Sequence, residues 1–121
     1  MPAFPRIPAL VVESNPRVLR HVMRLLRKAG HDVRGAPEAV EACVILQSFR
    51  PQVALIDPQL DCVETVIDRL RRLRGIQLIA LCQGDPFHAR VSLWAGHVRR
   101  PVEAAVLSRV LAAIASHRET V

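Results

Sequence analysis

Hydrophobic residues along this chain alternate between short, nearly continuous runs and longer stretches with helical spacing. Mostly apolar runs occupy residues 9–12, 53–56 and 76–81, and weaker ones occupy 31–35 and 97–100. Such runs, when they lie between helical patterns, are typical of parallel strands that are buried on both faces. The pattern therefore predicts five strands.

The stretches that follow these runs carry apolar residues three and four positions apart, the spacing of an amphipathic helix. Helices are expected at 15–29, 37–49, 63–73, 85–94 and 102–114.

Individual residues predict the two ends of the first helix and the inward face of the second. Asn15 and Pro16 form a helix start, since asparagine accepts from free backbone N–H groups and proline suits the first turn. Gly30 is expected to end that helix. The second helix is expected to turn four apolar residues toward the sheet, namely Val40, Cys43, Val44 and Leu46.

Five strand–helix units in succession imply a doubly wound α/β fold, because right-handed crossovers place helices on both faces of a parallel sheet. The 121 residues suffice for one domain, expected at 9–118. Residues 1–8 are expected to form an arm, because Pro2, Pro5 and Pro8 favour an extended path.

Two of the predicted strands end at a carboxylate. Residues 9–12 are followed by Glu13, and residues 53–56 are followed by Asp57. Ligands of open parallel sheets bind at the carboxyl ends of the strands. We therefore expect Glu13 and Asp57 to meet in one pocket.

The composition indicates the cellular compartment and excludes some classes of function. Three cysteines form neither an even disulfide set nor a metal-ligand spacing, which favours a reducing cytoplasm. The chain has no apolar stretch long enough for a membrane helix. It has no nucleophile–base pair or glycine-rich phosphate loop, so we expect no enzyme with a substrate of its own.

The net charge is +6, and positive side chains are concentrated in the first predicted helix. Five cations recur there three and four residues apart and share one face: Arg17, Arg20, Arg24, Arg27 and Lys28. The face is either a docking surface for an acidic partner or an ordinary solvated surface. Aromatic residues do not interleave with it, so nucleic acid is not an expected partner of this domain alone.

From residues 10 to 117 the sequence resembles the receiver domains of bacterial response regulators, as the site residues show. Asp57 stands where that family has its phosphoacceptor aspartate, and Glu13-Ser14 stands where it has an acidic pair that holds Mg²⁺. The resemblance implies a flavodoxin-like (βα)5 fold with strand order 2-1-3-4-5.

The resemblance also implies roles for residues around Asp57. Glu13, Asp57 and the backbone carbonyl of Gln59 would bind Mg²⁺. Other residues match phosphate-contacting or switch positions: Ser14, Cys82, His97, Arg100 and Pro101. Cys82 replaces a threonine or serine, and Arg100-Pro101 replaces a lysine–proline pair. No position is expected to act as a catalytic residue.

In such a receiver, a sensor histidine kinase or phosphotransfer protein would phosphorylate Asp57 and change the surface that binds a downstream effector. The fourth helix, fifth strand and fifth helix could also support a homodimer. Ser14, Cys82 and Arg100 keep two alternatives open: a pseudo-receiver that binds partners without phosphorylation, with Arg100 neutralising Glu13 and Asp57, and the receiver half of an RNA-binding antiterminator.

Overall fold

The computed structural model describes residues 6–83 and 94–119, with side chains of the last helix described as far as Ile114. Its five strands form one parallel sheet in the order β2-β1-β3-β4-β5. This order confirms the flavodoxin-like fold. The strands are β1 (Pro8–Val12), β2 (Asp32–Ala36), β3 (Val53–Ile56), β4 (Gln77–Cys82) and β5 (Gly96–Arg99).

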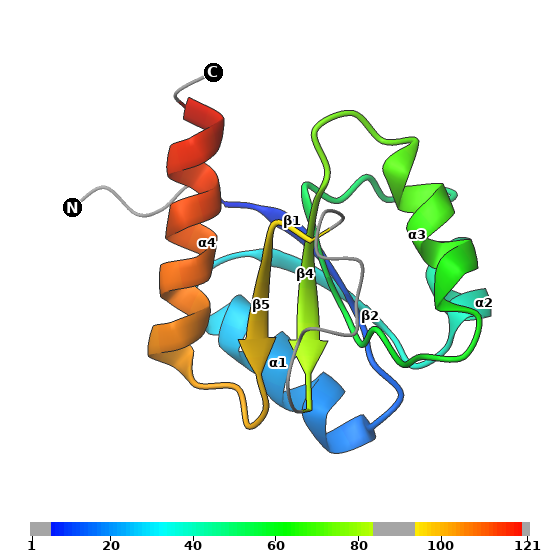
Figure 1. Ribbon diagram of the computed structural model, residues 1–121, viewed down its shortest axis with the longest axis horizontal. Helices are drawn as coiled ribbons and strands as arrows, with labels where there is room; N and C mark the ends of the chain where they lie inside the picture. The colour runs from blue at the N-terminus through cyan, green and yellow to red at the C-terminus, as the bar shows by residue number, and fades with distance from the viewer. Residues whose placement is uncertain (1–5, 84–93, 120–121) are drawn as a thin grey trace.

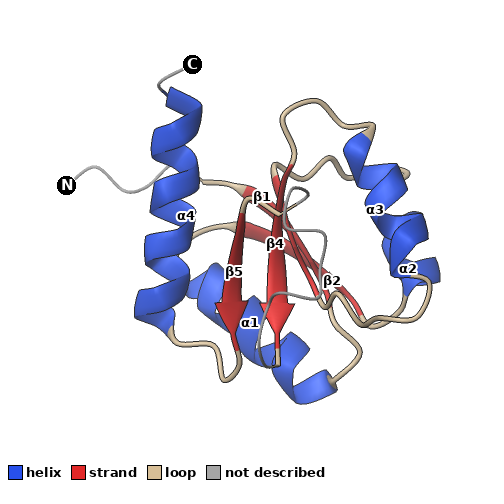
Figure 2. Cartoon of the chain, in the orientation of Figure 1, coloured by secondary structure: helices blue, strands red, loops and turns tan. Residues whose placement is uncertain are grey.

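Helices cover both faces of the sheet (Figures 1 and 2). Helices α1 (Pro16–Lys28) and α4 (Ala104–Glu119) lie on one face, and α2 (Ala39–Ile45) and α3 (Val63–Arg71) lie on the other. The helix expected at 85–94 falls almost wholly outside the described residues. Among the described residues, no helix is both long and apolar enough to span a membrane.

Two hydrophobic cores sandwich the sheet because successive strand residues point to opposite faces. In β1, Ala9 and Val11 join the core beneath α1 and α4, whereas Leu10 and Val12 join the core beneath α2 and α3. All four residues of β3 are buried. The central strands are therefore buried on both faces, as their continuous apolar runs predict.

Helix α1 begins and ends where the sequence predicts. The Asn15 side chain accepts hydrogen bonds from the N–H groups of Arg17 and Val18. After the helix, Gly30 has a φ of 95°, which glycine adopts without the strain a side chain would bring. The Met23 side chain of this helix packs on Gly35 of β2, where a Cβ would lie 2.3 Å from the methionine sulfur. Gly35 thus permits the close approach.

The inward face predicted for the second helix is partly wrong. Val40 and Val44 are 72% and 56% exposed, whereas Ala39 and Ala42 are buried. Leu46 is partly buried, as expected. Small side chains on the contact face let α2 lie close to the sheet and to α3, and this packing outweighs the greater hydrophobicity of valine. The helix is also shorter than expected, Ala39–Ile45 rather than 37–49.

Candidate functional site

Glu13 and Asp57 meet at the carboxyl edge of the sheet. They directly follow β1 and β3, which are neighbours with Val12 paired to Ile56. Backbone hydrogen bonds continue the strand pairing into both residues: the N–H of Glu13 donates to Ala36 O and the N–H of Asp57 donates to Val12 O, each at 3.0 Å. The two carboxylates are therefore placed by the rigid centre of the fold.

Arg100 joins these carboxylates from the far edge of the sheet. Its backbone N–H donates to Cys82 O at 2.9 Å, which anchors the residue just beyond β5. Its Nη2 forms an ion pair with Glu13 Oε1 and lies 3.3 Å from Asp57 Oδ2. We call Glu13, Asp57 and Arg100 the ionic cluster.

The ionic cluster is nearly closed to solvent. The Glu13 side chain is fully buried, and those of Arg100 and Asp57 are only 13% and 14% exposed. Burial raises the pKa of Glu13, and the nearby charge of Asp57 adds to the rise. The Asn15 N–H and the Arg100 guanidinium oppose it. Arg100 thus supplies the main positive charge that offsets a deeply buried carboxyl.

Backbone N–H groups hold the carboxylate oxygens that Arg100 leaves free. Asn15 N–H donates to Glu13 Oε2 at 3.0 Å, and Gln59 N–H donates to Asp57 Oδ1 at 2.9 Å. The anchoring role of Asn15 was not expected from sequence, although the Asn15-Pro16 helix start places its N–H directly after Glu13. All four carboxylate oxygens of the pair therefore have partners.

This arrangement does not fit Mg²⁺ as it stands. The ion prefers oxygen ligands in a strict octahedron, and here the carboxylates of Glu13 and Asp57 are both paired with the guanidinium of Arg100. Among the described residues, no group of three or more histidine, cysteine, aspartate or glutamate side chains could hold a metal. Glu13, Asp57 and the Gln59 carbonyl would first have to lose Arg100 as a neighbour.

The other predicted site residues lie around the cluster rather than in it. Cys82 is buried, and its thiol lies 3.9 Å from the Ala80 carbonyl of its own strand. Burial raises the pKa of this thiol. The side chains of Ser14, His97 and Pro101, all within the described part of the chain, are exposed and make no hydrogen bond to the cluster.

The guanidinium of Arg100 keeps an unused donor that is buried. Its Nε is buried, and within the described residues it has no hydrogen-bond partner. Its Nη2 also lies 3.5 Å from the carbonyl of Leu81. A buried donor without an acceptor is costly, so the site can gain by taking up an additional oxygen at this position.

Comparisons with known proteins identify the fold. No protein-family model matches the chain, and no curated protein matches it. Solved structures do match. The signal receiver domain of a modulated diguanylate cyclase from Desulfovibrio desulfuricans G20 aligns with a TM-score of 0.78 at 24% identity, covering 95% of this chain and 98% of that one.

Two further receiver structures are similar. The receiver domain from Methylobacillus flagellatus has a TM-score of 0.79 at 18% identity, covering 90% of this chain and 98% of its own. The receiver domain of a sensor histidine kinase from Pseudomonas aeruginosa PAO1, described with a magnesium ion in its active site cleft, has a TM-score of 0.74 at 20% identity, covering 88% and 94%. This chain therefore has the fold of response-regulator receiver domains.

Proposed function

We propose that this chain acts as a response-regulator receiver domain in two-component signal transduction, with Asp57 as its phosphoacceptor. The observation that carries the proposal is the position of Asp57, which lies at the carboxyl end of the central strand β3 beside Glu13 and Arg100. A sensor histidine kinase or phosphotransfer protein would supply the phosphoryl group. An effector protein would bind the altered surface.

The chemistry requires a free carboxylate oxygen and a cation near the phosphorus. In the transfer, an Asp57 oxygen forms a P–O bond while the bond from phosphorus to the donor's histidine nitrogen breaks. Arg100 would then exchange Asp57 Oδ2 for a phosphoryl oxygen. Its unpartnered Nε supports this role, because a guanidinium can bind two oxygens at once.

A second candidate function is supported by the ionic cluster itself. Arg100 already neutralises Glu13 and Asp57, so the domain could present one constant surface without phosphorylation. Such a pseudo-receiver would bind the same classes of partner. The two candidates differ in whether anything displaces Arg100 from Asp57.

A thermal melt separates these functions. We would compare the melting temperature with and without Mg²⁺ plus beryllium fluoride, a phosphoryl mimic, for the wild type, Asp57→Ala and the control Asp61→Ala, which changes an exposed aspartate in the following loop. A ligand that binds the folded state raises the melting temperature. A rise in the wild type and control but not in Asp57→Ala supports phosphorylation, whereas no rise in any protein supports the pseudo-receiver.

The proposal extends to the cellular compartment of the protein and to its partners. We infer a cytoplasmic protein without catalytic activity of its own, which agrees with the three free cysteines. Receiver domains of a kinase and of a cyclase are among its structural neighbours, which supports kinase and effector partners. A homodimer would use the helix expected at 85–94, which lies almost wholly outside the described residues, together with β5 and α4, and sedimentation velocity with and without beryllium fluoride would test it.

A further inference from the structure

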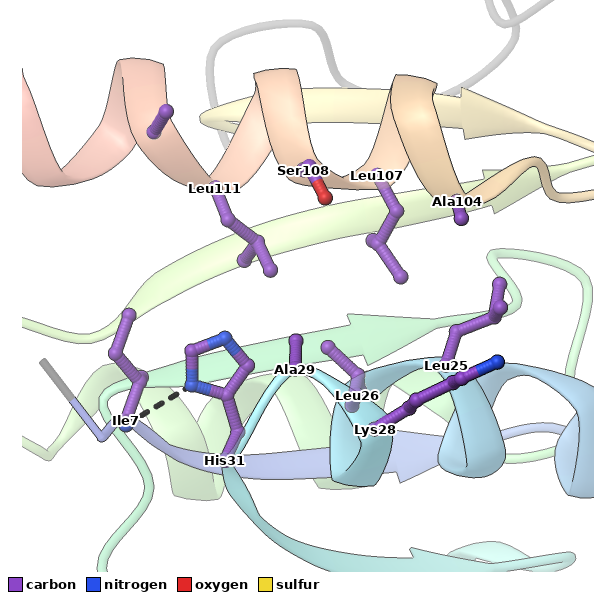
Figure 3. A pocket seen from close by; sticks show the side chains of 11 residues that line it. Ile7, Leu25, Leu26, Lys28, Ala29, His31, Ala104, Leu107, Ser108 and Leu111 are labelled. Carbon is purple, nitrogen blue, oxygen red and sulfur yellow. Dashed lines mark hydrogen bonds between the residues drawn. The ribbon is translucent and has the colours of Figure 1, made fainter. Parts of the chain in front are cut away.

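A cavity lies at the opposite edge of the sheet from Asp57, between α1 and α4 (Figure 3). Ile7 and His31 immediately precede β1 and β2, so the cavity lies at the amino ends of these strands. Its volume is about 230 Å³, larger than the roughly 150 Å³ engineered cavity that holds a benzene molecule in another protein. It can therefore hold one substituted ring.

The walls of the cavity are mostly apolar. Leucines from both helices face each other across it, namely Leu25, Leu26, Leu107 and Leu111. Ser108 and Lys28 also line it, and both are exposed at its rim. An apolar lining with few polar groups is the usual composition of a small-molecule site.

His31 provides a single polar group inside this lining. The residue is 8% exposed, and its Nδ1 accepts a hydrogen bond from the Ile7 N–H at 3.2 Å. A neutral ring that accepts at Nδ1 carries its proton on Nε2. Burial lowers the pKa of His31 and so favours this neutral form.

The donor on Nε2 has no acceptor within the described part of the protein. Figure 3 shows the ring between Ile7 and Ala29, with its second nitrogen on the side that faces α4. Among the described residues, this nitrogen is not one of the solvent-inaccessible unpaired atoms, so it opens onto the cavity, where a ligand oxygen can accept its hydrogen bond in place of water.

We propose that this cavity binds a small, uncharged, mostly apolar molecule whose carbonyl oxygen accepts a hydrogen bond from His31 Nε2. The lining around His31 is apolar and its one cation, Lys28, is exposed at the rim, so a carbonyl suits the buried position better than a carboxylate, whose burial without a partner is far more costly. The site is independent of Asp57 and its phosphorylation. It would give the domain a second input at the edge of the sheet remote from the ionic cluster.

Two isosteric probes test the proposal. Acetophenone carries the carbonyl, and α-methylstyrene replaces that oxygen by a CH₂ group while keeping the shape. We would titrate each into the full chain and follow the methyl signals of Ile7, Leu107 and Leu111, together with the Nε2 signal of His31, by NMR. Acetophenone should shift all of them saturably, and α-methylstyrene should bind roughly three- to tenfold more weakly because it lacks the acceptor.

The variants change exposed residues, so that the proteins are expected to fold. Ser108→Leu should narrow the mouth of the cavity and weaken the acetophenone shifts, while Ser48→Leu, an exposed change far from the cavity in sequence, should leave them intact. Equal affinity for both probes, or an acetophenone affinity unchanged by Ser108→Leu, refutes the proposal. Contacts between the side chains of residues 1–5 and Leu111 without any probe would also overturn it, since the chain itself would then occupy the cavity.

Discussion

At the scale of single residues, Arg100 is the side chain that pairs with both carboxylates of the ionic cluster. It compensates a fully buried carboxylate, Glu13, and at the same time pairs with Asp57, the proposed phosphoacceptor. One guanidinium nitrogen, Nη2, lies against both carboxylates and does both tasks. The same side chain therefore offsets a buried charge and pairs with the carboxylate that we propose to react.

Removing that cation tests its structural role. Arg100→Met should lower the free energy of unfolding by about 3 kcal/mol, because it leaves the Glu13 carboxylate buried without its ion partner. Arg100→Lys, which keeps the charge, should recover part of the loss. Urea denaturation at neutral pH measures both, and a loss no larger than that of an exposed ion pair would contradict the cluster.

The raised pKa of Glu13 predicts a pH dependence of stability. The folded state holds the Glu13 proton more tightly than the unfolded state, so stability falls as pH rises from the ordinary pKa of 4.5 to the higher folded value. Glu13→Gln cannot titrate and should lack this decline. Denaturation of both proteins over this window should therefore show the free-energy difference moving in favour of the variant as pH rises, whereas parallel curves would contradict the shift.

At the scale of elements, α2 shows how packing chooses a helix face. Alanines on one side and valines on the other give the helix two apolar faces, and the alanine face contacts the sheet.

Two substitutions on α2 test this orientation. Val44→Lys should change the free energy of unfolding by less than about 0.5 kcal/mol, because Val44 is exposed. Ala42→Leu should cost about 1 to 3 kcal/mol, because the larger side chain overpacks a filled contact. Urea midpoints compare the two, and the reverse order would restore the orientation expected from sequence.

At the scale of the whole molecule, the sheet couples two cores that share the same strands. Leu55 on β3 lies in the core beneath α1 and α4, while Trp94 packs against the core on the opposite face. A substitution that destabilises one core should therefore destabilise the other.

Leu55→Ala tests this coupling. The substitution leaves a cavity in the central strand and should lower the free energy of unfolding by about 3 to 4 kcal/mol. Trp94 fluorescence and far-UV circular dichroism should lose their native signals in one common transition. Val40→Ala, an exposed aliphatic change, is the matched control, and separate transitions by the two probes would contradict a single cooperative unit.

The sequence by itself determined the strands, the class of sheet and the meeting of Glu13 with Asp57. Buried parallel strands require continuous apolar runs, and the carboxyl ends of such strands lie at one edge. A chain pattern is sufficient for these features because they depend on local composition and on a general rule of handedness.

Only the tertiary structure decided which face of α2 is buried, that Arg100 bridges both carboxylates, and that His31 lines a cavity. Each depends on distances between segments far apart in the chain: Arg100 and Glu13 are separated by 87 positions. Their contact follows from the pairing of β5 with β4 and from the direction of one side chain. Packing between elements sets those side-chain directions, and they cannot be predicted from the local pattern of residues.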